Sequence, residues 1–188
     1  MSDRGDIQHE LRRELGSSER LLWSGMPRQG IMFQAFDLFL IPFFLVWMGV
    51  PLAALFDTAS SGRHQGSLLF LVPFVVIGAY MLVGRFIVDA KQRAHTFYGL
   101  TNQRILIVSA WRKRRTTSLK LKLLPDLTLT EARNGRGSIQ FGADRWPGAG
   151  WFGSGWPGAR QYMSPRFDLA DNVRAVYDTI VRAQNEAT

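Results

Sequence analysis

The sequence predicts a helical membrane hairpin joined to an α+β unit of short antiparallel strands that a C-terminal helix closes. Three observations predict this class. Charged residues are absent from 38–56 and from 65–84, short apolar runs alternate with turn signals over 94–142, and a helical apolar period follows residue 168. The chain has 188 residues, which suits one domain or two small ones.

The N-terminal segment, residues 1–37, is predicted to contain a short helix and a strand. Ile7, Leu11 and Leu15 recur at helical spacing between charged residues, and a glycine follows them as a stop signal. Residues 19–27 are typical of a brief strand that a Gly/Pro turn ends, and we expect Trp23 to lie on its apolar face and to fill a core.

The two uncharged stretches have the length of a bilayer crossing. Residues 38–56 would rise about 28 Å as a helix, close to the ~30 Å of a hydrocarbon core. Residues 65–84 repeat the case, so the sequence predicts a two-helix hairpin over 38–84 with a connecting linker at 57–66. Three prolines lie inside these spans, where we expect kinks, because membrane helices tolerate proline.

Basic residues set the expected topology. The linker holds one, Arg63, whereas arginine and lysine flank both spans on the other side, which places both termini in the cytoplasm and the linker outside. A cleaved signal peptide fits poorly, because the first span begins behind a long polar segment without a small-residue cleavage site. The chain is therefore expected to be a multi-pass protein of the cytoplasmic membrane.

The hairpin is expected to act as an anchor. Neither span contains an ionisable side chain, and proton relays, ion paths and intramembrane proteases all need one. Gly49 and Ala53 form one small-xxx-small step, which could support homo-oligomer formation by close helix approach or could be mere composition.

Residues 85–188 are expected to form the cytoplasmic α+β unit. Asp168 is predicted to cap the C-terminal helix, with Asp171 at the capping-box position. Five strands are predicted, with turns between them at 101–103, 112–115, 125–126 and 134–137: they cover 94–100, 104–111, 115–124, 126–132 and 137–143.

The run YGLTNQRILIVSAW, a basic hairpin, a strand ending in GSIQF and a terminal amphipathic helix together resemble the bacterial pleckstrin-homology-like (PH-like) domain of small membrane proteins. In that family an LW-G-P segment precedes a transmembrane hairpin, and Leu22, Trp23, Gly25 and Pro27 match it. The resemblance implies a β-sandwich or partly open barrel with a C-terminal helix, used for binding, in the bacterial inner membrane. The run 101–104, Thr-Asn-Gln-Arg, is its most specific piece, and we interpret it as a turn that marks the fold.

The strongest electrostatic feature is a run of four cations at a predicted hairpin tip. The candidate residues for contact with anionic inner-leaflet lipid are Arg112, Lys113, Arg114, Arg115 and Lys120. Two other interpretations stay open: a solvated turn without a ligand, and a site for an acidic protein partner. Residues 85–188 hold 17 basic and 8 acidic residues. Nucleic acid is not expected as a partner, since no recognition motif appears.

A Gly/Trp-rich stretch at 142–163 is the second candidate surface. Its aromatic residues must pack on the domain, at the membrane interface or on a protein partner, because glycine-rich chain forms no regular structure around them. The candidate interface residues are Trp146, Trp151, Phe152 and Trp156.

Catalysis is not expected. The chain has no cysteine, its three histidines, His9, His64 and His95, lie too far apart for a metal motif, and no nucleotide-binding or nucleophile motif appears. We expect no cofactor and no metal. The predicted function is a membrane-anchored, non-catalytic binding module for anionic lipid or a membrane protein; the alternative is an accessory or assembly subunit of a larger membrane complex.

Overall fold

The fold is that of a computed structural model, which describes residues 3–34, 36–61, 65–124, 126–144 and 163–187. The chain divides into two units. The β unit contains the described residues up to Gly30 and from Ala90 onward, and the helical unit contains those from Ile31 to Asp89. Each unit is described by itself.

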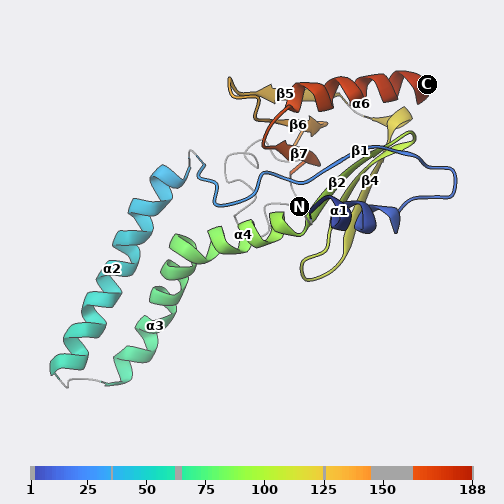
Figure 1. The fold of residues 1–188 in the computed structure, drawn as a ribbon. Coiled ribbons are helices and arrows are strands. Elements are labelled where there is room, and N and C mark those ends of the chain that lie inside the picture. Colours follow the sequence, from blue (N-terminus) through green and yellow to red (C-terminus); the bar gives the residue numbers. More distant parts are fainter. Residues whose placement is uncertain (1–2, 35, 62–64, 125, 145–162, 188) are drawn as a thin grey trace. The chain divides into compact units, whose positions relative to one another are not determined.

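A four-stranded antiparallel sheet forms one layer of the β unit (Figure 1). Its strands lie in the order β1 (Leu21–Gly25), β2 (Thr96–Thr101), β3 (Arg104–Ser109) and β4 (Arg115–Lys120). Because β1 pairs with β2, the segment before the apolar spans completes a sheet whose other strands follow them.

A second antiparallel sheet has three strands in the order β5 (Leu127–Glu131), β6 (Gly137–Phe141) and β7 (Arg166–Leu169). A short 3-10 turn, Leu121–Leu123, lies between β4 and β5. The β5–β6 turn contains Gly135 at φ 73°, a left-handed conformation that glycine adopts without steric cost.

Both sheets and helix α6 (Val173–Ala187) contribute to one apolar core. Phe167 of β7 is fully buried at its centre, stacked on Tyr98 with ring centroids 4.3 Å apart and edge-on to Phe141 at 5.1 Å. Trp23 packs against the same core, with its ring 5.7 Å from Phe167, which confirms the core position predicted for it. Two antiparallel sheets with helices confirm the predicted α+β class.

Helix α1 (Asp3–Arg12) covers the outer face of the four-stranded sheet. Ile7 and Leu11 are buried there against Leu106 and Val108 of β3. The neighbouring Ile105 faces the main core, so β3 is buried on both faces, which accounts for its unbroken apolar sequence.

The start of the C-terminal helix differs from the prediction. Asp168 does not cap a helix: it lies in β7, opposite Ser138, and its carbonyl oxygen accepts a hydrogen bond from the Arg28 amide at 2.9 Å. The helix begins at Val173, after Asn172 at φ 50°. Pairing with β6 and burial of Phe167 and Leu169 outweigh the local capping signal.

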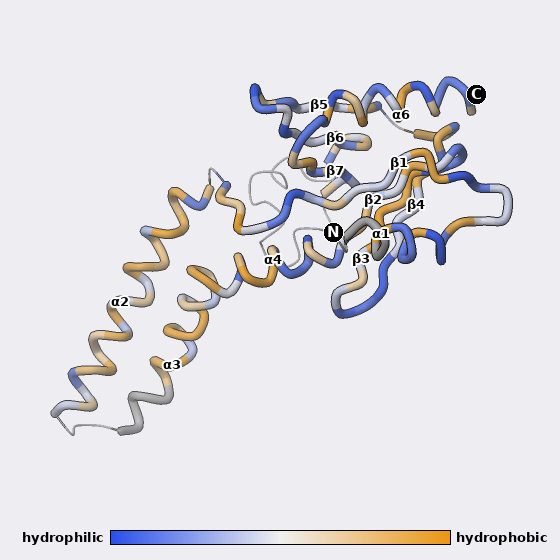
Figure 2. Tube along the Cα trace, in the orientation of Figure 1, coloured by the Kyte–Doolittle hydropathy of each residue, from blue (hydrophilic) through white to orange (hydrophobic). Residues whose placement is uncertain are grey.

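The helical unit consists mainly of two long apolar helices, as Figure 2 shows. Helix α2 (Asp37–Ser61) is followed by α3 (Gln65–Ala79), a π-helical turn (Tyr80–Gly84) and α4 (Arg85–Ala94). Helices α2 and α3 approach closely at Gly78, where an added Cβ would lie 2.7 Å from the Met48 Cβ. An added Cβ on Gly49 would meet no atom within 4 Å, so Gly49 lies away from this contact.

A buried ion pair joins the two ends of the hairpin. The Arg85 Nη2 lies 2.5 Å from the Asp37 Oδ1, and each residue is only 4% exposed. The Gln34 amide donates to the other Asp37 oxygen at 2.7 Å, and the Arg85 Nε donates to the Met81 carbonyl at 2.7 Å. The two charges that bound the apolar spans in the sequence therefore neutralise each other.

Candidate functional site

The predicted basic hairpin is the β3–β4 connection. Arg104–Ser109 and Arg115–Lys120 pair in antiparallel register up to Ser109 and Arg115, and the connecting residues 110–114 together with Arg115, the first residue of β4, form what we call the basic loop. The Ala110 amide donates to the His95 carbonyl at 2.8 Å. This bond ties the loop to the residue just before β2.

The four cations of the run have different surroundings. All four residues are exposed, but Arg114 differs in its hydrogen bonds. The Arg112 guanidinium lies 4.9 Å from the ring centroid of the half-buried Trp111. Arg112, Lys113, Arg115 and the indole ring are the groups that the loop presents to an external ligand.

Arg114 is held by α1 and the turn after it instead. Its Nη1 donates to the Glu10 carboxylate at 2.5 Å, its Nε to the Glu14 carboxylate at 2.9 Å, and its Nη2 to the Glu10 carbonyl at 3.1 Å. The hydrogen bond from Arg114 lowers the pKa of Glu10, and the bonds to Glu10 and Glu14 raise the pKa of Arg114. Both side chains therefore stay charged at neutral pH.

The structure does not bring Lys120 to the basic loop. Lys120 ends β4 opposite Arg104, whereas the loop lies at the start of that strand. A six-residue strand is about 17 Å long at ~3.3 Å per residue, so Lys120 lies at the opposite end of the sheet. The second candidate surface, with Trp146, Trp151, Phe152 and Trp156, lies outside the described residues.

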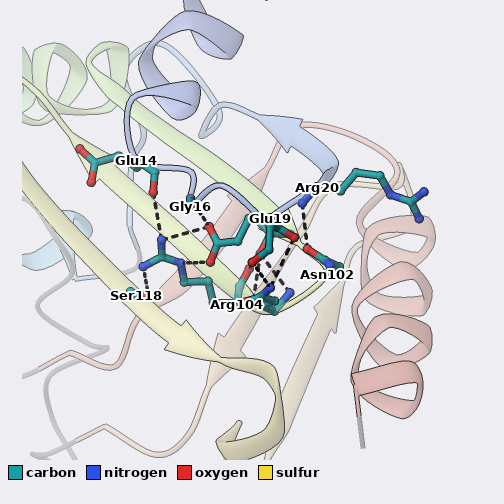
Figure 3. Close-up of polar contacts among 10 residues, drawn as sticks. Glu14, Gly16, Glu19, Arg20, Asn102, Arg104 and Ser118 are labelled. Carbon is teal, nitrogen blue, oxygen red and sulfur yellow. Dashed lines mark hydrogen bonds and ion pairs between the residues drawn. The ribbon is translucent and has the colours of Figure 1, made fainter.

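The sheet end around Lys120 holds a second polar cluster, centred on Arg104 (Figure 3). The Arg104 Nε lies 2.7 Å from one Glu19 carboxylate oxygen, and its Nη2 donates to the other at 3.0 Å and to the Glu14 carbonyl at 2.9 Å. Its Nη1 donates to the Ser118 hydroxyl at 3.3 Å. Arg104 thus binds β3 and β4 to the segment that connects α1 with β1.

Residues 101–104 form the predicted turn, and the Thr101 side chain makes the predicted hydrogen bonds to the backbone. The Thr101 hydroxyl accepts the amides of Gln103 and Arg104 at 3.1 and 2.9 Å. Asn102 does not adopt a positive φ, although asparagine tolerates it: its side-chain oxygen accepts the Arg20 amide at 2.9 Å, and its amide donates to the Arg20 carbonyl at 3.1 Å. The turn therefore holds the N-terminal segment in place, which is a structural role.

Replacing Glu19 by glutamine is expected to lower the free energy of unfolding by about 1.5–3 kcal/mol, the range for hydrogen bonds to charged groups. Burial alone would raise the pKa of the Glu19 carboxyl, but the hydrogen bonds from Arg104 and the Gly16 amide outweigh it and lower the pKa below its ordinary 4.5. A lowered pKa stabilises the fold above pH 4.5 and ceases to do so as the pH falls through the folded-state value.

Denaturant unfolding of both proteins at neutral and acidic pH measures this effect. The difference in free energy of unfolding between the two proteins should be largest at pH 7. It should shrink only when the pH falls below the ordinary range of the glutamate pKa. A difference in free energy of unfolding that stayed constant into strong acid would contradict the stabilising role of the ionised Glu19 carboxylate. Asp126→Asn, a change at an exposed carboxylate, is the control and should leave stability nearly unchanged.

Within the described part of the chain, no group of three or more His, Asp or Glu side chains is placed to hold a metal ion. The features that remain as a candidate site are therefore the basic loop and the apolar surface of the helical unit.

No protein-family model matches the chain, and no curated protein matches it. Among solved structures, it is similar to the crystal structure of a DUF1696 family protein with a pleckstrin-homology domain from Shewanella loihica. The two sequences are 9% identical, the TM-score is 0.38, and the match covers 96% of this chain and 95% of the other. A match of this extent assigns neither a family nor a function to the chain.

Proposed function

We propose that the protein is a membrane-anchored, non-catalytic binding module of a bacterial inner membrane, in which a PH-like β unit contacts anionic lipid through its basic loop. The helical unit is the anchor. Both termini and the β unit lie in the cytoplasm, and the linker between α2 and α3 lies outside.

The exposed surface of the helical unit supports the anchor. Two helices, Asp37–Ser61 and Phe70–Ala94, are long and apolar enough to span a membrane, with mean hydropathies of 2.3 and 2.2. Only 11% of each apolar window is buried, whereas the core helix of a soluble protein is mostly buried. Leu38, Phe56 and Phe70 are each more than 70% exposed. Exposure of so much apolar surface to water is strongly unfavourable, and a bilayer removes this cost.

The position of the basic loop within the sheet is the observation that carries the lipid proposal. Strand β1 ends at Gly25 opposite Tyr98, and β2 begins at Thr96 opposite Ser109, beside the loop. The chain connections toward α2 and from α4 therefore leave the sheet at the end where the loop lies. With α2 and α3 in a bilayer, both chain connections from the membrane would reach the sheet at this end.

Electrostatics then favour contact with an anionic surface. Each basic side chain near such a membrane contributes about 1 kcal/mol, within a Debye length of ~8 Å at physiological salt. Arg112, Lys113 and Arg115 are exposed and supply this charge, and Trp111 offers an amphipathic ring suited to the interface. Lys120, at the other end of the sheet, is not part of this proposed contact.

Changing Arg112, Lys113 and Arg115 together to glutamine is expected to weaken contact of the loop with anionic bilayers. The equilibrium constant for contact should fall roughly 100-fold at low salt, because each charge contributes about 1 kcal/mol. The test uses the full chain, because β1 completes the sheet. The chain is reconstituted in nanodiscs of phosphatidylcholine, with or without phosphatidylglycerol. A fluorophore on Ala110→Cys, the only cysteine, reports quenching by spin-labelled headgroups.

The matched control changes Lys122, Arg133 and Arg136 to glutamine, because these cations are also exposed and lie outside the loop. It alters the net charge equally and should leave quenching in anionic nanodiscs nearly unchanged. Equal quenching in neutral and anionic nanodiscs for the unmodified loop would refute the lipid proposal. The alternative of an accessory subunit would then gain support from a stoichiometric membrane partner that co-purifies in mild detergent.

A further inference from the structure

Helix α1 and the turn that follows it, which we treat together as the α1 segment, present two carboxylates to the basic loop. Glu10 and Glu14 lie one helical turn apart in sequence, and both bind the guanidinium of Arg114, at 2.5 and 2.9 Å. A lipid phosphate offers the same kind of ligand to an arginine: negatively charged oxygens that accept two parallel hydrogen bonds. The two carboxylates therefore occupy the donor groups that a headgroup would use.

Apolar contacts, and not these ion pairs, hold α1 on the sheet. Leu11 is fully buried, and Ile7 is 7% exposed. Leu11 packs over Gly99 of β2, where an added Cβ would lie 3.1 Å from the leucine Cδ2, so a side chain at this position would require Leu11 to shift by a few tenths of an ångström. Arg104 also holds the Glu14 carbonyl from the other side. The helix is thus docked without the help of Arg114.

The Arg114 ion pairs contribute little to stability. The side chains of Arg114, Glu10 and Glu14 are 34%, 25% and 25% exposed, and solvent screening leaves surface ion pairs of this kind with a small effect on stability. The ion pairs matter more for the local charge than for the stability of the fold. They pair one of the four cations of the run and place two negative charges beside the loop, with Arg13 as a partial counter-charge 4.0 Å from Glu10.

We propose that α1 is a built-in competitor of the lipid surface: Glu10 and Glu14 occupy Arg114 and so weaken the contact of the basic loop with anionic headgroups. This inference rests on the proposed function and specifies its regulation. Release of Arg114 from the two carboxylates would convert a loop with three available cations into one with four and would remove the repulsion from α1.

The test is a double-mutant cycle in the full chain, with the labelled Ala110→Cys protein in phosphatidylcholine nanodiscs with and without phosphatidylglycerol. Changing Glu10 and Glu14 to glutamine should strengthen contact with anionic nanodiscs by roughly 5-fold or more, since each charge near the surface counts for about 1 kcal/mol. Because a paired Arg114 cannot bind a headgroup directly, Arg114→Gln should weaken contact less in the unchanged background than in the Glu10→Gln, Glu14→Gln background, where the loss should be roughly 5-fold.

The matched control changes Asp171 and Asp178, two exposed acids outside α1, to asparagine. It should leave contact nearly unchanged, which separates competition at Arg114 from net charge. An equal loss of contact from Arg114→Gln in both backgrounds would overturn this inference, because Arg114 would already be available to lipid. The proposed function would still stand. Equal quenching in neutral and anionic nanodiscs for every variant would overturn the proposed function and the inference with it. Unchanged thermal unfolding of the variants shows that α1 remains docked.

Discussion

Replacing Arg85 by alanine is expected to destabilise the helical hairpin by about 3–5 kcal/mol, the cost of leaving one member of a buried ion pair without its partner. The Asp37 carboxylate, which is 4% exposed in the structure, would lose the guanidinium that lies 2.5 Å away. The Met81 carbonyl would also lose the hydrogen bond from the Arg85 Nε. Reversible unfolding in mixed detergent and SDS micelles, followed by circular dichroism, measures the loss.

The double variant Asp37→Asn with Arg85→Gln is the informative control. It removes both charges while keeping polar groups of similar size, so it should recover a large part of the lost stability. A double variant as unstable as Arg85→Ala alone would show that the charge of Asp37 is not the source of the cost. Arg28→Ala, a change at a cation before the first span, should have a small effect.

Impermeant maleimide is expected to label the outer linker of the hairpin and to spare the β unit, an all-or-none difference. Single cysteines at Ser60 and Ser118 give the clean comparison, because the chain has no other cysteine and both serines are exposed. On intact cells Ser60→Cys should react and Ser118→Cys should be protected, since arginine and lysine keep the flanks of the spans in the cytoplasm.

Permeabilised cells supply the control, because both cysteines should then react to the same extent. Labelling of Ser118→Cys on intact cells would invert the proposed topology. It would also remove the anionic inner leaflet as the surface that the basic loop meets. Protection of both positions on intact cells would contradict an outer linker.

Local sequence patterns predicted the elements that depend on neighbouring residues. A run of bilayer length without charge is a one-dimensional property, and the two runs correspond to α2 and to α3 with the π-helical turn that follows it. Alternation and turn residues predicted β2 to β6, and the hydroxyl of Thr101 predicted its own turn. These signals act within a few residues, so no tertiary information is needed to read them.

Strand β7 was missed because four residues carry too little pattern. Its sequence, RFDL, alternates, but Asp168 followed by a helical period is also a capping signal. Hydrogen bonding to β6 and the burial of Phe167 decide between the two. Neither can be read without knowing which strand lies alongside.

Local patterns were therefore enough to predict the class of the protein: two apolar helices, short antiparallel strands and a run of four cations. How those charges are used depends on the three-dimensional fold. Arg114 meets Glu14 across 100 residues of sequence, and Arg85 meets Asp37 across 48. Such pairs leave no local pattern, because a charged side chain looks the same in sequence whether water, lipid or a distant carboxylate surrounds it. The fold sets that distance, and Coulomb interaction and desolvation then decide the outcome.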